Sequence, residues 1–426
     1  MMLIAALFGS FAFALILGMP ISIALGASSA IYMVLADIDL AVVPQFMYSG
    51  MDSFVLLCIP GFVLAGNLMN GGGITDQIVR FGKALVGHVP GGLGLANVTG
   101  SMIFAGISGT AVAETASIGS VMIPAMRKSG YDGPFSAALT AAASTVGPII
   151  PPSVPMIIAG TLTGLSVGKM FLAGAVPGLL LGAGMLLTVY VLARRRNYPR
   201  GEWMGFGELA RSSRGAIWAL LMTVIILFGI VGGYFTPTEA SIVAAFYAFV
   251  IGLFVYKGFK LRHLPGLLLE SAVGSGGLIL LVGLANVFGW ILTSEQIPQT
   301  IADAMLSLTE NKFLIILMIN ILLLIVGTFM ETIAALIILF PPLLAVATSV
   351  GIDPVHFAIF SILNLMIGLT TPPVGVCLFV AANIARLPLS DVIKGIWPFL
   401  LCNGIVLLLV SYVPAISLWL PGLFYK

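Results

Sequence analysis

Apolar runs of about 17–25 residues, the length that crosses the hydrocarbon core of a bilayer as a helix, recur along almost the whole of this chain. Of its 426 residues 60% are hydrophobic and only 8% are charged, whereas a typical soluble domain carries about 25% charged residues. Within lipid every backbone polar group must be paired, and a helix pairs these groups inside one segment. We therefore expect an all-α polytopic membrane protein.

Ten spans are predicted, at 2–18, 20–38, 53–72, 135–166, 168–193, 215–233, 236–256, 268–292, 354–385 and 397–422. Two further segments, near 92–127 and 313–348, contain a break in the middle of the run and are predicted to be re-entrant hairpins. With the amino terminus placed outside, all but three of the 18 lysines and arginines fall in cytoplasmic loops, as the positive-inside rule requires. We therefore expect both termini on the outer side of the membrane.

A proline-rich break interrupts one of these spans. It reads Gly147-Pro148-Ile149-Ile150-Pro151-Pro152-Ser153-Val154-Pro155. Each proline removes a backbone donor and clashes with the preceding turn, so this stretch cannot be helical. Irregular backbone at membrane depth is tolerated only where it is buried in protein or lines a cavity. A similar break, from Gly368 to Pro373, follows 221 residues later.

The two breaks belong to a longer internal repeat. Thr236-Pro237 follows Met19-Pro20 at an offset of 217, and the stretch GTFMET at 327–332 matches GTAVAET at 109–115 with one residue deleted. The offsets drift by only four residues over most of each half. Each half is predicted to cross the membrane five times, an odd number, so the second half is expected to be inverted relative to the first.

The predicted organisation is therefore two inverted repeats joined by a basic connector. The first repeat covers 1–193, with its hairpin at about 92–127 and its proline-broken helix at about 135–166. The cytoplasmic connector covers 194–214. The second repeat covers 215–426, with its hairpin at about 313–348 and its broken helix at about 354–385. In such folds substrates and coupling ions bind where helices of both repeats are interrupted.

The breaks carry the predicted chemistry. Unwound backbone leaves carbonyl oxygens without donors, because the prolines downstream have no N–H. A hard cation such as Na⁺ would satisfy them, since hard cations prefer oxygen ligands. One Na⁺ is predicted between Ser108 on the first hairpin tip and the carbonyls of Gly147, Ile150 and Pro151. A second is predicted among Gly327, Thr328, Gly368, Thr371 and Pro372.

The alternative interpretation is that the prolines only kink the helices, while the Ser and Thr hydroxyls bond back to carbonyls of the preceding turn. Under that interpretation neither break would bind an ion. The occurrence of two matching breaks, each facing a Gly-Thr hairpin tip, favours the ion sites.

An anionic substrate is predicted at the same place. The half-helices that restart near Ser153 and Val374 would point N-terminal N–H groups, which favour anions, toward the breaks. Ser153, Ser108 and Glu331 are the candidate substrate contacts. Glu331 and its counterpart Glu114 lie just past the hairpin tips. They could balance ion charge, bind protons or bind a substrate hydroxyl, or instead cap the outgoing hairpin helix.

Several motifs together resemble one family. The stretches GISGTAVAETASIGSVMIPAM, GPIIPPSVPMIIAG, FTPTEAS, GTFMETIAALIILFPPLL and GLTTPPVGVCLFV are similar to the large membrane (M) subunit of tripartite ATP-independent periplasmic (TRAP) transporters. The resemblance covers essentially the whole chain. It implies an elevator mechanism within a wider ion-transporter superfamily, coupling to two or more Na⁺ ions, and a bacterial inner (cytoplasmic) membrane with both termini in the periplasm.

The resemblance also implies partners and residue roles. The partners would be a small four-helix membrane subunit, a periplasmic substrate-binding protein, membrane lipid and an organic acid, with no nucleic acid. By motif, Ser108, Gly147 and Pro151 fall at a first Na⁺ site and Gly327, Thr328 and Gly368 at a second. Ser153 and Glu331 become candidates for substrate contact.

Sialic acid is the preferred substrate, since one carboxylate and many hydroxyls suit a polar site with one acid acceptor. A C4-dicarboxylate or another carboxylate is the alternative. A dicarboxylate symporter that works without a binding protein is a further possibility. An enzyme is not expected, because the three histidines lie near no nucleophile or carboxylate motif and the three cysteines have no metal-binding spacing.

Overall fold

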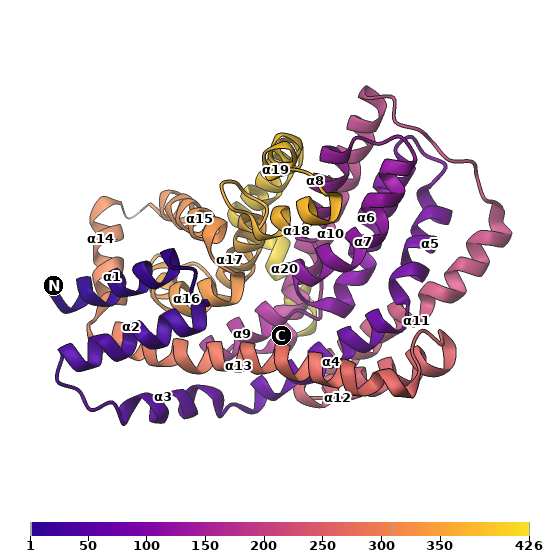
Figure 1. The fold of residues 1–426 in the computed structure, drawn as a ribbon. Coiled ribbons are helices and arrows are strands. Elements are labelled where there is room, and N and C mark those ends of the chain that lie inside the picture. The colour runs from indigo at the N-terminus through magenta and orange to yellow at the C-terminus, as the bar shows by residue number, and fades with distance from the viewer. Residues whose placement is uncertain (1, 310, 426) are drawn as a thin grey trace.

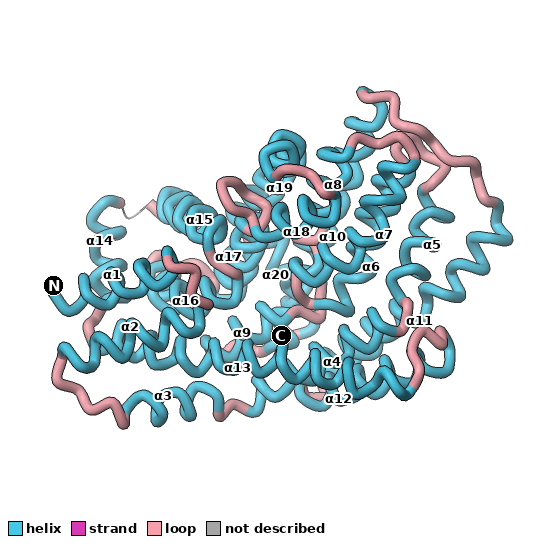
Figure 2. Tube along the Cα trace, in the orientation of Figure 1, coloured by secondary structure: helices cyan, strands magenta, loops and turns pink. Residues whose placement is uncertain are grey.

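The computed structural model describes residues 2–309 and 311–425, without the side chains of residues 107, 108 and 302. Within these residues the chain forms helices and connecting turns and no strand (Figure 2). The α-helices are α1 (Met2–Ile16), α2 (Ile21–Leu35), α3 (Val42–Met51), α4 (Cys58–Gly71), α5 (Ile74–Val86), α6 (Gly92–Ser108), α7 (Ala111–Lys128), α8 (Gly133–Ala143), α9 (Val154–Thr163), α10 (Val167–Arg195), α11 (Gly205–Val231), α12 (Pro237–Val250), α13 (Leu264–Ser294), α14 (Ile297–Leu308), α15 (Lys312–Phe329), α16 (Thr332–Ser349), α17 (Pro354–Gly368), α18 (Val376–Ala385), α19 (Leu389–Tyr412) and α20 (Ala415–Phe424). Short 3₁₀ or π turns are η1 (Phe54–Leu57), η2 (Gly147–Ile149), η3 (Ile251–Val255) and η4 (Leu261–His263).

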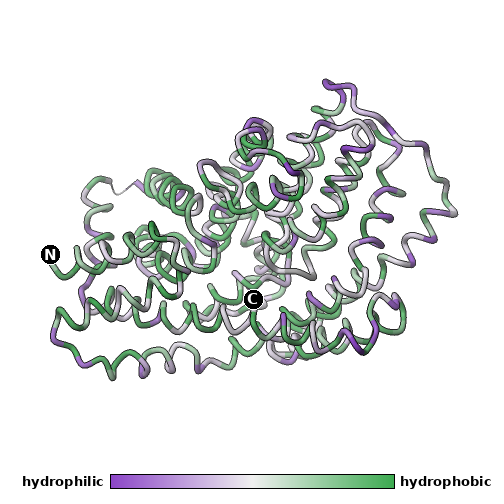
Figure 3. The backbone as a smooth tube through the Cα atoms, in the orientation of Figure 1, coloured by the Kyte–Doolittle hydropathy of each residue, from purple (hydrophilic) through white to green (hydrophobic). Residues whose placement is uncertain are grey.

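Eight of the described helical segments are long and apolar enough to cross a membrane, and the bent pair formed by 133–149 and 154–163 makes a ninth. Hydrophobic residues run through helices across the whole molecule (Figure 3). The prediction of an all-α polytopic membrane protein is confirmed. The segments predicted as hairpins are two helix pairs, α6–α7 and α15–α16.

The predicted spans differ from the helices at several ends. The first two spans are α1 and α2, each only 15 residues long. A turn separates them because Gly18 adopts a positive φ of 78° and Pro20 follows. The predicted span 354–385 is divided between α17 and α18, and the predicted span 397–422 is divided between α19 and α20 at Val413.

Three amphipathic helices were not predicted from the apolar runs. They are α3, α5 and α14, of 10, 13 and 12 residues. One face of α5 is buried, through residues such as Ile74 and Ile78, whereas Arg80 pairs with Glu208 at an N–O distance of 2.6 Å. The helix α5 joins α4 to the first hairpin, and α14 joins α13 to the second hairpin. Connecting helices therefore occupy corresponding places in the two repeats.

Two groups of helices pack mainly within themselves. The first, which we call the scaffold layer, consists of α1–α4 and α11–α13. The second, the hairpin domain, consists of α6–α10 and α15–α20. In Figure 1 the long helix α13 runs along the lower part of the molecule, with α6–α8 and α17–α19 above it. The two groups meet where α6 packs against α11 and where α16 packs against α13.

The two broken helices are interleaved across the repeats. The second half of the second broken helix, α18, packs against α7 and α8 of the first repeat. Correspondingly, α9 packs against α16 and α17 of the second repeat. Each break is therefore contacted by helices of both repeats; the first is buried in protein, whereas Pro373 and Val374 of the second are exposed.

Tyr198 is one of the residues that hold the segment 196–204, the non-helical part of the connector, against the hairpin domain. The Tyr198 hydroxyl donates to the Asp132 carboxylate at 2.6 Å, and its ring stacks on Tyr131 with centroids 4.6 Å apart. Burial, together with the hydrogen bond to Asp132, raises the pKa of Tyr198 to about 12. The phenol therefore stays a neutral donor at any physiological pH.

Candidate functional site

The first break is a compact knot between α8 and α9. After the 3₁₀ turn at Gly147–Ile149 the chain extends through Ile150, and the Pro151–Pro152 bond is cis. The Ser153 hydroxyl caps α9 by accepting from the Met156 N–H at 3.3 Å, and it donates to the Pro148 carbonyl at 2.5 Å. The predicted substrate contact Ser153 is therefore fully buried, and its hydroxyl is used within the knot.

The carbonyl oxygens of this knot differ in the number of hydrogen bonds that they accept. The Gly147 oxygen, predicted to be free for an ion, accepts the Ile150 N–H at 3.2 Å. Within the described residues no protein donor reaches the carbonyl oxygens of Ile150 and Pro151. Two of the three carbonyls predicted for the first Na⁺ thus have both lone pairs available, and Gly147 retains one.

The second break repeats this arrangement. The Thr371 N–H donates to the Gly368 carbonyl at 2.9 Å, and the Pro372–Pro373 bond is cis. The Gly375 N–H, directly before α18, donates to the Thr328 carbonyl on the second hairpin tip at 3.3 Å. Hairpin and broken helix of the second repeat are therefore joined through backbone groups.

Two glycines make the closest approach between the second tip and its break. A Cβ built on Gly368 would lie 2.6 Å from the Cα of Gly327, and a Cβ built on Gly327 would lie 3.2 Å from the Cα of Gly368. In the first repeat, the tip residue Gly109 (φ 63°) lies against Val154. The structure thus brings together Gly327, Thr328 and Gly368, whereas the side chain of Ser108 lies outside the described residues.

The threonine hydroxyls of the second site bond back to the preceding turn. Thr328 donates to the Ile325 carbonyl at 2.7 Å, and Thr371 donates to the Ile367 carbonyl at 2.9 Å. This is the bonding that the kinked-helix alternative requires. A hydroxyl that donates its proton still offers lone pairs, so both oxygens remain able to coordinate a cation.

The Glu331 carboxylate caps α16. Its Oε2 accepts the N–H groups of Ile333 at 2.8 Å and Ala334 at 3.3 Å. Capping was one of the alternatives left open by the sequence, and it uses one carboxylate oxygen only. The other oxygen remains available for a substrate hydroxyl.

Replacing Glu331 separates these two uses. In Glu331→Gln the side-chain oxygen still caps the helix, so we expect the melting temperature to change little. Hydrogen bonds to a charged group contribute roughly 1.5–3 kcal/mol against about 1 kcal/mol for neutral ones, so apparent substrate affinity should fall about tenfold. Glu331→Ala should in addition cost about 0.5–2 kcal/mol of stability. Uptake kinetics equal to those of the unmodified chain in Glu331→Gln would leave the residue with capping alone.

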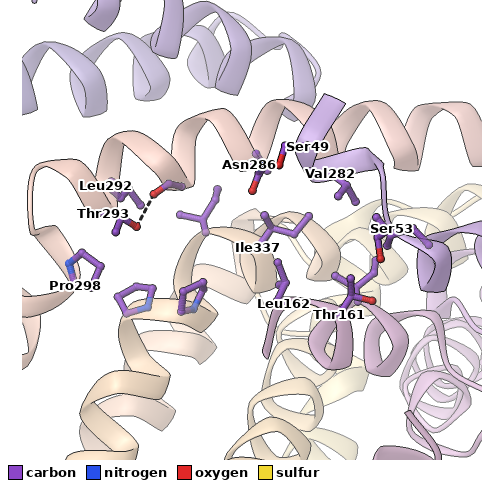
Figure 4. A pocket seen from close by; sticks show the side chains of 18 residues that line it. Ser49, Ser53, Thr161, Leu162, Val282, Asn286, Leu292, Thr293, Pro298 and Ile337 are labelled. Atoms are coloured by element: carbon purple, nitrogen blue, oxygen red, sulfur yellow. Dashed lines mark hydrogen bonds between the residues drawn. The ribbon is translucent and has the colours of Figure 1, made fainter. Parts of the chain in front are cut away.

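A cavity of about 390 Å³ lies between the scaffold layer and the hairpin domain (Figure 4). Its walls come from the end of α3, from α13, and from α9 and α16. The polar side chains that line it are neutral: Ser49, Ser53, Thr161, Asn286 and Thr293. Asn286 donates to the Phe46 carbonyl at 2.8 Å, as expected for an interhelical hydrogen bond.

The sequence did not predict this cavity. Its residues come from five separate segments, and its polar side chains lie outside the motifs that the sequence singles out. Asn286 was the one available signal, as a polar residue inside an apolar run.

No group of three or more His, Cys, Asp and Glu side chains that could hold a metal ion occurs in the described part of the chain. An ion at either break would be coordinated by backbone and hydroxyl oxygens. This donor set suits a hard cation and not a transition metal.

Residues 8–416 match the family model described as the DctM component of the tripartite ATP-independent periplasmic transporter. The chain is 41% identical over 408 residues to the sialic acid TRAP transporter large permease protein SiaM of Vibrio cholerae, covering 96% of each chain. It is 42% identical over 376 residues to the C4-dicarboxylate TRAP transporter large permease protein DctM of Pseudomonas aeruginosa, covering 88% of each.

A solved structure shares the fold. The YdaH transporter of Alcanivorax borkumensis, whose topology is described as unusual, superposes with a TM-score of 0.62 over 91% of this chain and 88% of that one, at 16% identity. The family match covers residues 8–416, and the two relatives cover 96% and 88% of this chain. The chain is therefore a TRAP transporter large permease of the DctM family, a transport protein and not an enzyme.

Proposed function

We propose that this permease imports an organic anion across the bacterial inner membrane, coupled to Na⁺ ions bound at the two breaks. The observation that carries the proposal is the pairing of each hairpin tip with a knot of unwound backbone that is contacted by helices of both repeats. The oxygens of Ile150 and Pro151 lack protein donors among the described residues. Carbonyl oxygens of unwound backbone at membrane depth need a partner, and a cation is one that the site can hold.

The transport step in this proposal is an elevator movement. The hairpin domain carries ions and substrate past the scaffold layer, while α5 and α14 join the two groups. With the first terminus outside, α5 lies on the cytoplasmic side and α14 on the periplasmic side. The amphipathic character of both helices suits the membrane interface.

The proposed partners follow from the family. A periplasmic binding protein delivers the substrate, and a small membrane subunit accompanies the permease. For the substrate we propose a polyhydroxylated monocarboxylate of the sialic acid type, because the polar side chains of the cavity are hydroxyls and amides without Lys or Arg. A C4-dicarboxylate is the second candidate, since the relative that carries that name is as similar to this chain as SiaM.

Uptake into proteoliposomes tests this function. The permease is reconstituted with its small subunit, and the loaded binding protein is added outside under an inward Na⁺ gradient. We expect accumulation of sialic acid that stops when K⁺ replaces Na⁺ or when the binding protein is left out. Excess unlabelled sialic acid should compete, and excess succinate should not.

Three outcomes would contradict parts of the proposal. Uptake that persists in K⁺ would remove the Na⁺ coupling. Uptake by the permease without a binding protein would indicate a symporter that works alone. Competition by succinate instead of sialic acid would assign the dicarboxylate class.

A further inference from the structure

A second group of buried oxygens lies inside the first hairpin, beside the first break. Glu114, in the first turn of α7, is fully buried, and neither of its carboxylate oxygens has a hydrogen-bond partner. An unpaired carboxylate in the interior of a protein costs several kcal/mol unless it is neutralised or coordinates an ion. Such a residue within a membrane protein indicates a function.

Two neighbours on α6 present further unpartnered oxygens. Ser101 lies close enough to interact with the Glu114 carboxylate, but the geometry is not that of a hydrogen bond, and its hydroxyl is otherwise without a partner. Asn97 lies one turn earlier on the same face of α6, and its Oδ1 is also without a partner. Both side chains are fully buried.

The orientation of the Asn97 amide is fixed by its other end. Its Nδ2 donates to the Thr140 hydroxyl at 2.6 Å, while that hydroxyl donates to the Ser136 carbonyl at 2.8 Å. The Thr140 oxygen can therefore only accept, and Asn97 must direct its nitrogen toward it. The atom left over on Asn97 is an acceptor.

Gly147 places this group of oxygens beside the first break. A Cβ built on Gly147 would overlap the Glu114 carboxylate, so only a glycine leaves room for it. The knot, α6 and α7 pack against one another at this point. The Glu114 carboxylate therefore lies next to Gly147, whose carbonyl is one of the oxygens proposed for the first tip site.

The equivalent carboxylate in the second repeat has a different environment. Glu331 precedes α16 as its cap, whereas Glu114 lies four residues after the capping position Thr110. The deletion that turns GTAVAET into GTFMET accounts for one residue of this shift, and the rest arises because α7 begins directly after Thr110 whereas α16 begins four residues after Thr328. Of these two matching carboxylates, Glu114 alone is buried without helix N–H donors.

We propose that Glu114, Ser101 and Asn97 form a Na⁺ site within the first hairpin, separate from the sites at the tips. The four unpartnered oxygen atoms are the two of the Glu114 carboxylate, the Ser101 hydroxyl and the Asn97 Oδ1. If Glu114 were protonated instead of binding a cation, its proton and that of Ser101 would be the only two donors for these four oxygens. A cation satisfies all four oxygens at once and balances the carboxylate charge. Hard cations prefer this set of oxygen ligands.

Equilibrium binding of ²²Na⁺ to the purified complex of the permease with its small subunit tests the site. Glu114→Gln should bind one Na⁺ fewer per permease than the unmodified chain. Ser101→Ala should keep the number of ions but weaken the apparent affinity several-fold, and this variant also serves if Glu114→Gln does not fold. The matched control is Glu202→Gln, in the exposed connector, which should bind as the unmodified chain does.

The results of this experiment distinguish the Na⁺ site at Glu114 from the Na⁺ sites proposed at the hairpin tips. An unchanged number of ions in Glu114→Gln would overturn the site, as would an unchanged affinity in Ser101→Ala. If Glu114→Gln loses a titratable proton but binds as many Na⁺ ions as the unmodified chain, Glu114 binds a proton and not Na⁺. That result would also overturn the site. If the unmodified chain binds a single Na⁺ that Glu114→Gln removes, the hairpin site stands and the tip sites fail.

Discussion

Gly368→Ala is expected to abolish most of the Na⁺-dependent uptake. The new Cβ would lie 2.6 Å from the backbone of Gly327, where two main chains approach each other and neither has a flexible side chain that could yield. Overpacking of this kind costs about 1–3 kcal/mol, and here it would separate the second hairpin tip from its break. That range corresponds to about 5- to 150-fold in apparent Na⁺ affinity.

Uptake as a function of Na⁺ concentration measures this effect. The matched control is Gly404→Ala, in the interior of α19, where no atom lies within 4 Å of the added methyl group. That variant should transport normally and gain about 0.5–1 kcal/mol of stability from helix propensity. Normal Na⁺ dependence in Gly368→Ala would show that the contact between tip and break does not hold an ion.

A disulfide between Gly106→Cys on α6 and Thr223→Cys on α11 is expected to stop transport. A Cβ built on Gly106 lies 3.0 Å from the Thr223 Cβ, close to the span of about 3.5–4.5 Å that a disulfide bridges. The bond would join the hairpin domain to the scaffold layer. If the hairpin domain moves as an elevator, uptake should fall to background on oxidation and return on reduction.

The control for this experiment is a disulfide within the scaffold layer. Gly61→Cys on α4 and Ser241→Cys on α12 are suitable, because a Cβ built on Gly61 lies 2.7 Å from the Ser241 Cβ. Oxidation of this pair should leave uptake unchanged. The elevator proposal would be excluded by full cross-linking of the first pair with normal uptake. Cys402, which is partly exposed, is replaced in both backgrounds to prevent side reactions.

The sequence predicted the elements whose signals are local. Prolines and glycines interrupt helices, so the sequence alone predicts the breaks at Gly147 and Gly368 and the hairpin turns. The amphipathic helices α5 and α14 were missed because a search for long apolar runs passes over segments with one charged face.

The bonding state of individual side chains was beyond the sequence. Glu114 and Glu331 match in the repeat, but α7 begins directly after Thr110 and so includes Glu114 in its first turn, whereas α16 begins only after Glu331, which caps it. Whether Ser153 is free or used within its knot depends on the path of the chain through Pro148, which no local pattern specifies. The cavity beside Asn286 depends on how distant segments pack.

The short helix α2 has a consequence for the surrounding lipid. It has 15 residues and therefore extends about 22 Å, less than the roughly 30 Å hydrocarbon thickness of an average bilayer. Mismatch of this sign is accommodated by thinning of the adjacent bilayer, at a cost of fractions of a kcal/mol per Å. The free energy of this part of the scaffold layer therefore depends on the acyl-chain length of the lipids around it. It is lowest in membranes with a thin hydrocarbon core.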